Sequence, residues 1–361
     1  WTGISAATPD PAGAADAAAL DVAKRNGFPN DDVIAKVTVN IPPKSGPFTG
    51  NLAHVEVLIT YYQSRYFSTI WGTEKLPIQA RAVARAFWGA DRNGIVVLDP
   101  TAKDALDASG TGSVTVTGGA GVIVDSNNAE AGRATGGGSL TADNFYIVGG
   151  YTGAFTGNVV TGTQPIPDPL ASLPPPTKPT AGTMTMVNVS GAKTYTLTPG
   201  AYSSLPNFGN GDTVILQQGG LYYIDGGGLT ATNGASILMD PTTTGGVMIY
   251  NAPTGTQQNQ GINISGGTVT LSPMTDGPYA GLLFWQERAS PVSMSIQGQG
   301  GFTILGTFYA ANALLSVSGQ GNNTIGSQYI SRKLSLSGGG NTIIDYSEKA
   351  TARKRVIQLV E

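Results

Sequence analysis

Three segments near the end of the chain share one pattern: SIQGQGGFTILG (295–306), SVSGQGNNTIGS (316–327) and SLSGGGNTIID (335–345). Their glycine triplets begin at Gly298, Gly319 and Gly338, which are 21 and 19 residues apart. Each segment alternates apolar and polar residues, as a strand with one buried face does, and turns at glycine. Repeats of about twenty residues, too small to bury their own apolar side chains, are typical of stacked β-solenoids.

Glycine makes up 51 of the 361 residues, whereas charged residues make up only 12% and hydrophobic residues 40%. A chain this apolar is folded, and its glycines mark turns because glycine adopts positive φ without steric cost. Short apolar runs between glycine corners extend back from the repeats to about Ile95. We therefore predict a mainly β protein whose larger part is a right-handed parallel β-helix. A β-sandwich is the alternative architecture.

The first ninety residues follow a different pattern. An alanine-rich stretch begins after Pro11 and ends at Gly27, which predicts a helix with a favourable start and stop. Alternating apolar residues then predict strands near 37–41, 55–61 and 78–87. This order of elements predicts a small α+β domain ahead of the β-helix.

These changes of pattern predict four segments: the α+β domain (1–92), the first β-helix coils (93–164), a proline-rich segment (165–180), and the main β-helix with a C-terminal cap (181–361). The proline-rich segment contains PIPDPLASLPPPTKP, with seven prolines in fifteen residues. Such a sequence favours the extended polyproline II conformation. We expect it to be a strap along one face of the β-helix or a linker between two halves.

The charged residues argue against several classes of function. A net charge of −3 provides no basic surface for nucleic acid, and no cysteine is present for a thiol nucleophile, a disulfide or a Cys-based zinc site. Glycosidic hydrolysis needs two carboxylates at a set separation. The acids between Gly200 and Asp345 are scattered singly, and His54 is the only histidine. We therefore predict no enzymatic activity, no cofactor and no metal, with a β-helix polysaccharide lyase as a remaining alternative.

Two sets of residues are candidates for contacts with partners. A ligand face would contain aromatic rings beside an acid–base pair: Tyr279, Phe284, Trp285, Glu287 and Arg288. Assembly contacts would come from the two ends of the chain: Trp1, Thr2, Gly3, Ile4, Arg353 and Arg355. The first four residues suit a donor strand, because an edge strand in a sheet accepts a strand from another subunit.

Several stretches carry a resemblance to a known family: AADAAAL (14–20), VTVNIPP (37–43), VEVLITYYQSRYFSTIWG (55–72) and LPIQARAVARA (76–86). They resemble the bacterial tight-adherence (Flp) pilus-assembly proteins of the TadE/TadG-like group. LDPTAKDALDASGTGSVTV (98–116) and DGPYAGLLFWQER (276–288) are similar to segments in the long C-terminal extensions of planctomycete-type members. Such proteins normally carry a membrane-spanning helix just before the AADAAAL stretch. The resemblance therefore implies that any membrane anchor lies upstream of this chain.

Together these observations predict a non-enzymatic structural protein of the extracellular space or the bacterial cell surface. We expect it to assemble with copies of itself into a filament or to join a pilus. Other cell-envelope proteins and surface glycans are the further expected partners. A surface adhesin or carbohydrate-binding β-helix is the alternative function, and the aromatic ligand face would then carry it.

Overall fold

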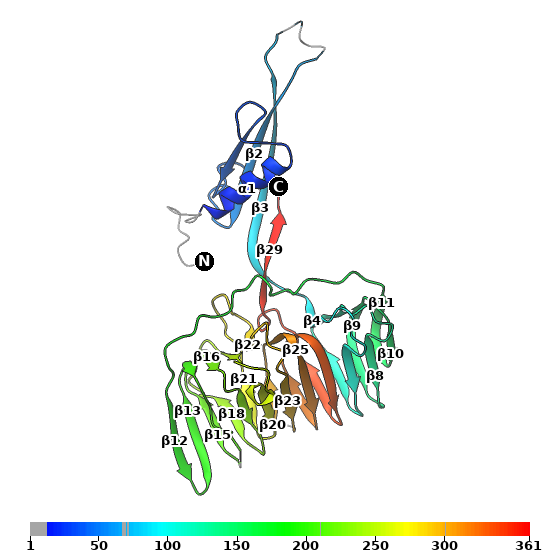
Figure 1. Cartoon of the computed structure of the whole chain (residues 1–361), viewed down its shortest axis with the longest axis vertical. Helices are drawn as coiled ribbons and strands as arrows, with labels where there is room; N and C mark the ends of the chain where they lie inside the picture. The colour runs from blue at the N-terminus through cyan, green and yellow to red at the C-terminus, as the bar shows by residue number, and fades with distance from the viewer. Residues whose placement is uncertain (1–12, 67–69, 71, 210, 300) are drawn as a thin grey trace. The chain divides into compact units, whose positions relative to one another are not determined.

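The structure is a computed structural model that describes residues 13–66, 70, 72–209, 211–299 and 301–361. The chain forms two compact units, one of residues 1–89 with 355–361 and the other of residues 90–354. Strands predominate in both units (Figure 1). The prediction of a mainly β chain is therefore confirmed. None of the helices in the described ranges is long and apolar enough to span a membrane.

The described residues of the first unit form a four-stranded sheet and one α-helix. The strands lie in the order β1 (Ala35–Asn40), β2 (His54–Gln63), β3 (Leu76–Ala90) and β29 (Arg353–Leu359). Both β1 and β3 pair antiparallel with β2. Helix α1 (Ala14–Arg25) contacts β1 and buries Ala23, while alanine dominates the rest of its length.

The position of the last strand, β29, shows that one prediction is wrong. The sequence predicts that the C-terminal tail caps the β-helix, but β29 forms the edge of the first unit's sheet. Val83 of β3 donates its N–H to the Glu361 carbonyl at 2.8 Å and accepts from the Val360 N–H at 2.9 Å. The alternating pattern of the tail indicates a strand. It does not indicate which sheet the strand joins, because the partner is far away in the sequence.

The described residues of the second unit form one sheet of 25 strands, which we call the large sheet. All its strand pairs are parallel except that of β12 (Met184–Val189) with β13 (Ala192–Leu197). The pairings fall into three ladders that the chain visits in turn, as a parallel β-helix would require.

Ladder 1 contains, in spatial order, β14 (Gly200–Tyr202), β16 (Gly220–Asp225), β19 (Val247–Ala252), β22 (Leu282–Gln286), β25 (Thr307–Gly319), β27 (Gln328–Gly338), β4 (Asn93–Val97), β7 (Gly121–Val124), β9 (Ser139–Ile147) and β11 (Phe155–Thr161). Ladder 2 contains β17 (Leu229–Ala231), β20 (Ile262–Ser265), β23 (Met294–Gly298), β25, β27, β5 (Leu106–Ser109), β8 (Gly132–Thr135) and β10 (Tyr151–Gly153). Ladder 3 contains β12, β13, β15 (Thr213–Leu216), β18 (Ser236–Met239), β21 (Val269–Leu271), β24 (Phe302–Ile304), β26 (Asn322–Ile325), β28 (Asn341–Ile344), β6 (Ser113–Val116), β9 and β11.

The chain enters the large sheet in its middle, at β4. It runs outward to one end at β11, and residues 165–180 then carry it back along the sheet to the other end at β12 (Figure 1). From β12 the strands return toward the middle, where β27 pairs with both β4 and β5. The proline-rich segment therefore joins a first block of strands, β4 to β11, to a second block, β12 to β28. We call this segment the strap (165–180).

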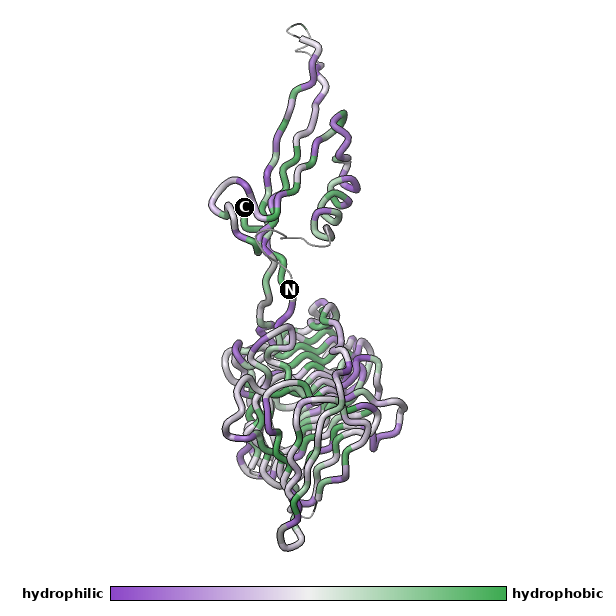
Figure 2. Tube along the Cα trace, turned by 90° about the vertical axis from the view of Figure 1, so that its left-hand side faces the viewer, coloured by the Kyte–Doolittle hydropathy of each residue, from purple (hydrophilic) through white to green (hydrophobic). Residues whose placement is uncertain are grey.

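Apolar residues of successive strands line up in rows inside the large sheet (Figure 2). Phe284, Phe308 and Tyr329 show the arrangement, because they are register partners and all are fully buried. Their neighbouring rings lie 5.0 and 5.2 Å apart. Each strand alone would leave such side chains in water, so burial is achieved only when the strands are stacked.

The glycine triplets lie at the corner between ladders 2 and 3. A Cβ on Gly340 would lie 2.1 Å from the Gly321 carbonyl, and one on Gly112 would lie 1.9 Å from the Gly340 carbonyl. The next glycine, Gly138, continues this column against Gly112 at 2.1 Å. Close approach of backbones therefore excludes side chains at Gly338, Gly340, Gly112 and Gly138, whereas a Cβ on Gly298 or Gly319 would lie 2.6 Å from a side-chain oxygen, that of Asn323 or Thr342.

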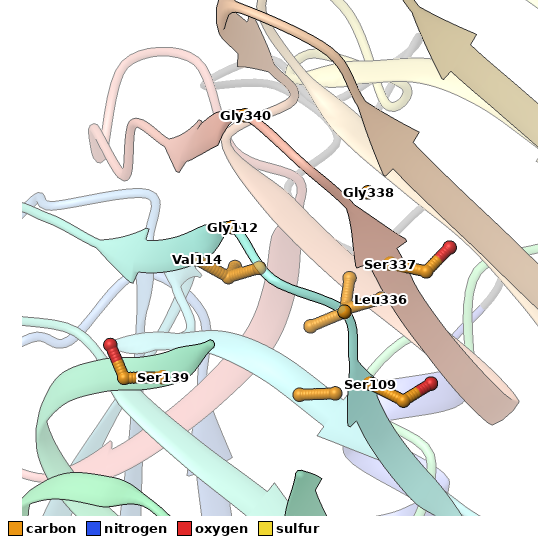
Figure 3. A pocket seen from close by; sticks show the side chains of 10 residues that line it. Ser109, Gly112, Val114, Ser139, Leu336, Ser337, Gly338 and Gly340 are labelled. Atoms are coloured by element: carbon orange, nitrogen blue, oxygen red, sulfur yellow. The ribbon is translucent and has the colours of Figure 1, made fainter. Parts of the chain in front are cut away.

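Residues at this corner enclose a cavity of about 10 Å³, shown with Val114, Ser139 and Leu336 around it (Figure 3). A cavity of this size holds at most one water molecule. The corner is thus a packing feature and offers no room for an organic ligand.

Candidate functional site

The predicted ligand face lies on ladder 1. Neighbouring residues of a strand point to opposite faces of a sheet. Phe284 therefore joins the inner row, whereas Trp285 belongs to an outer row. The outer row consists of register partners on four successive strands: Tyr223, Tyr250, Trp285 and Tyr309. Their ring centroids are separated by 4.9, 5.6 and 5.4 Å, which is typical of aromatic packing.

The strap is attached to this outer row and to the loops beside it. The Ile166 N–H donates to Asp125 at 3.1 Å, and the Tyr279 hydroxyl donates to the Pro174 carbonyl at 3.3 Å. Near the other end of the strap, Lys178 forms an ion pair with Asp225 at 2.5 Å. The strap side chains Leu170 and Leu173 are 2% and 1% exposed. The strap is therefore fixed to strands of both blocks, and its two leucines are packed away from water.

Arg288 holds the middle of the strap. Its Nη2 donates to the carbonyls of Leu170 and Leu173, both at 2.9 Å, and its Nε donates to the Tyr309 hydroxyl at 2.7 Å. The Tyr309 hydroxyl donates in turn to Asp168 of the strap at 2.5 Å. Charge-assisted hydrogen bonds of this kind are stronger than neutral ones. This group, which we call the Arg288 clamp, ties two strap turns to ladder 1.

Electrostatics keep the hydroxyls of the outer row protonated. Burial, followed by the charge of Asp168, raises the pKa of Tyr309 well above its usual value. Burial also raises the pKa of Tyr250, and its hydrogen bond to Glu287 raises it further. Both tyrosines are therefore donors to carboxylates, and neither is a candidate nucleophile or general base at neutral pH.

Four of the five residues of the predicted ligand face, Tyr279, Trp285, Glu287 and Arg288, are brought together beside the strap, whereas Phe284 lies in the core on the opposite face of its strand. Trp285 is fully buried and lies between the rings of Tyr250 and Tyr309, with Arg288 5.7 Å from its centroid. Glu287 accepts from Tyr250, and Arg288 forms the clamp. These aromatic rings are therefore covered in this structure, and the bound proline-rich segment occupies the place that a ligand would need.

The predicted assembly contacts are only partly visible. Trp1, Thr2, Gly3 and Ile4 lie outside the described residues. Arg353 is exposed in β29, and Arg355 belongs to the same strand, but its side chain is not described. Within the described ranges, no group of three or more His, Asp or Glu side chains is placed to hold a metal ion.

The first unit contains an ion-pair cluster that the sequence does not reveal. Glu56 of β2 is fully buried and accepts hydrogen bonds from Asn40 (2.7 Å), the Lys44 N–H (3.0 Å), Ser45 (2.5 Å) and Arg81 (2.7 Å). Arg81 also pairs with the Glu361 carboxylate at 2.6 Å. Burial would raise the pKa of Glu56, but these hydrogen bonds outweigh it and lower the pKa to about 2. The cluster fastens the last residue of the chain to β3.

An apolar groove of about 730 Å³ lies between α1 and the sheet of the first unit. Ala18 and Val22 line its helix side, Val57 and Ala82 its floor, and Leu359 its far side. A smaller polar pocket of about 440 Å³ lies in the second unit, beside the turns that follow β15 and β18. Neither the groove nor the polar pocket can be predicted from the sequence, because each is lined by segments that are distant in the chain.

Comparison with known proteins gives no relative: no family model, no curated protein and no solved structure matches this chain. The function therefore has to be argued from the geometry alone.

The Arg288 clamp predicts that Arg288→Met loosens the strap. Losing three hydrogen bonds from a charged donor should lower the free energy of unfolding by about 2 kcal/mol. Thermolysin, which cleaves before leucine, should then cut at Leu170 faster than in the wild type. Arg133→Met, which removes a half-exposed ion pair with Asp104, is the matched control. Equal cleavage in wild type and Arg288→Met would contradict the clamp.

The Glu56 cluster predicts a specific loss of stability in acid. The carboxyl of Glu56 has a pKa of about 2 when folded, below its usual 4.5. Its contribution is therefore complete above about pH 4.5 and is lost as the pH falls toward 2. We expect Glu56→Gln to be less stable than the wild type at pH 7 by urea unfolding, with a smaller difference at pH 3. The exposed Glu74→Gln should follow the wild type at both pH values, and a pH-independent difference would contradict the assignment.

Proposed function

We propose that the chain is a non-enzymatic structural subunit that assembles with copies of itself at the bacterial cell surface or outside the cell. The proposal includes a finer description of the large sheet: a right-handed parallel β-helix with three faces, corresponding to ladders 1 to 3. Membership of the TadE/TadG-like pilus-assembly group, and attachment to a pilus or a membrane through an upstream segment, are parts of the same proposal.

One observation carries the proposal: at each end of the large sheet, a strand without charged residues has one edge that pairs with no other described strand. β11 reads FTGNVVT and pairs only with β9 in the described chain, and β12 reads MTMVNV and pairs only with β13. Edge strands expose backbone N–H and C=O groups that can pair with another chain, and soluble proteins usually protect them with charged residues or proline. Ends left open in this way are suited to end-to-end association.

The body between these ends is suited to a mechanical role. The strap crosses from one block to the other and is attached at Asp125, Arg288 and Asp225. The aromatic outer row that would suit a sugar is covered by these contacts. Burial of the tyrosine hydroxyls against carboxylates also leaves the site without a free acid–base pair. These features support a rigid spacer rather than an enzyme.

A second candidate function rests on the polar pocket. Gln217, Gln218, Asp240 and Thr243 line it, and Asp240 accepts hydrogen bonds from the backbone and side chain of Thr242 at 2.8 and 2.6 Å. Amide, hydroxyl and carboxylate groups of this kind bind sugar hydroxyls. This pocket favours a surface glycan as a ligand, and binding on a glycan array that Asp240→Ala abolishes would support it.

The structural role predicts concentration-dependent assembly. Sedimentation velocity and negative-stain electron microscopy of the wild type should show species longer than one molecule. The double variant Val160→Lys, Met186→Lys places one charge on each end strand, at side chains that are 39% and 51% exposed. It should remain monomeric, because like charges would face each other in a new sheet.

Asn263→Lys is the matched control, because Asn263 is an exposed residue of the interior strand β20. It should assemble like the wild type. A wild-type chain that stays monomeric at millimolar concentration would contradict the proposed function.

A further inference from the structure

The outermost strand at one end of the large sheet is β12. It forms a tight hairpin with β13 through Ser190 and Gly191, which both have positive φ (53° and 94°), as a two-residue type I′ turn requires. No other described strand pairs with β12, so its second edge is open. Met184, Met186 and Val187 are 40%, 51% and 61% exposed. The strand is therefore held in register on one side and available on the other.

The apolar interior continues onto this strand and then stops. Met184 is the register partner of Leu197, and Met186 is the partner of Tyr195. Leu197 and Tyr195 are both buried and belong to the core. Directly opposite residues of paired strands lie on the same face of a sheet. The two methionines thus extend the core row by one strand, and a further strand beside β12 would cover them.

The charge pattern permits this further strand to be another β12. Residues 184–189 contain no charged side chain. In contrast, the edge strand β29 of the other sheet begins with Arg353, Lys354 and Arg355, which would repel a second copy of itself. Pairing of β12 with its own copy places only Met, Thr, Val and Asn side chains opposite one another.

The opposite end of the large sheet is a poorer match for β12. Only Phe155 and Thr156 of β11 lie beside the ladder 3 part of β9, because a bulge follows and the rest of β11 pairs on ladder 1. An incoming β12, which belongs wholly to ladder 3, would therefore find two partner residues there. A second β12, paired about a two-fold axis through Met186, offers five.

We propose that β12 is a self-association site, at which β12 of one molecule pairs antiparallel with β12 of a second copy about a two-fold axis perpendicular to the sheet. This axis keeps Met184 and Met186 of both copies on one face, so the two apolar rows become continuous. The contact is isologous, and ladder 3 of one molecule runs into ladder 3 of the next. The inference rests on the proposed function and identifies one of its contacts.

The test uses charge pairing in a background in which the β11 end is blocked by Val160→Lys. In this background the wild-type β12 should give dimers by sedimentation equilibrium. Met186→Lys and Met186→Glu should each raise the dimer dissociation constant by about tenfold or more, because like charges lie near the axis. An equimolar mixture of the two variants should dimerise again, since opposite charges then face each other. Asn263→Lys in the same background should dimerise like its parent.

Each result is decisive for the inference. Dimers of undiminished affinity in Met186→Lys, or an equimolar mixture that stays monomeric, would overturn it. Because the wild-type chain with both ends intact is measured in parallel, such a failure is distinguishable from failure of the proposed function. If that chain assembles while the β12 variants behave like their parent, only the β12 contact is wrong. If that chain never assembles, both proposals are wrong. Thermal unfolding of every variant confirms that the charge has not unfolded the hairpin.

Discussion

The rest of the second unit depends on one constraint, the pairing of β27 with β4 and β5 in the middle of the large sheet. We call this pairing the junction. There the backbone N–H groups of Leu98 and Asp99 donate to the carbonyls of Ser331 and Arg332, each at 2.9 Å, and the nearly buried Asp99 carboxylate pairs with Arg332. Because the first block occupies this position, the second block has to begin at the far end and wind back. A segment that returns along the whole sheet is then unavoidable, and the proline-rich strap is that segment.

The aromatic outer row needs a cover, and the strap provides it. Tyr250, Trp285 and Tyr309 point away from the core, and large aromatic rings are unfavourable in water, so a cover is required. A proline-rich segment is already extended before it binds and loses less conformational entropy than a flexible one. Two of its carbonyls, those of Leu170 and Leu173, accept hydrogen bonds from Arg288. The aromatic outer row, whose residues resemble a ligand face in the sequence, thus binds the strap and helps to hold the two blocks together.

Much of the architecture is predictable from the sequence, and the failures have physical causes. The spacing of Gly298, Gly319 and Gly338 predicts stacked strands with glycine corners, and a Cβ at each of these positions would lie within 2.6 Å of an atom of a neighbouring segment. The same pattern cannot predict the order of the two blocks, since every strand offers similar partners. Alternation separates Phe284 from Trp285, but it does not reveal that the strap covers the latter. Likewise, the pattern of β29 predicts a strand but not the sheet that it joins, and it does not reveal that Leu359 of this strand lines the groove beside α1.

The most direct test of this account measures whether β6 lies beside β28. Thr115 and Ile343 are register partners across the junction, and the chain has no native cysteine. The double variant Thr115→Cys, Ile343→Cys should therefore be bridged by a short thiol-reactive cross-linker with two maleimide groups within one molecule, as mass spectrometry of the digest would show. Thr115→Cys, Thr270→Cys is the control, because four strand spacings of about 4.8 Å place those residues about 19 Å apart. Bridging of the first pair alone is the predicted result. Failure to bridge Thr115→Cys with Ile343→Cys in the folded protein would contradict the order of the two blocks.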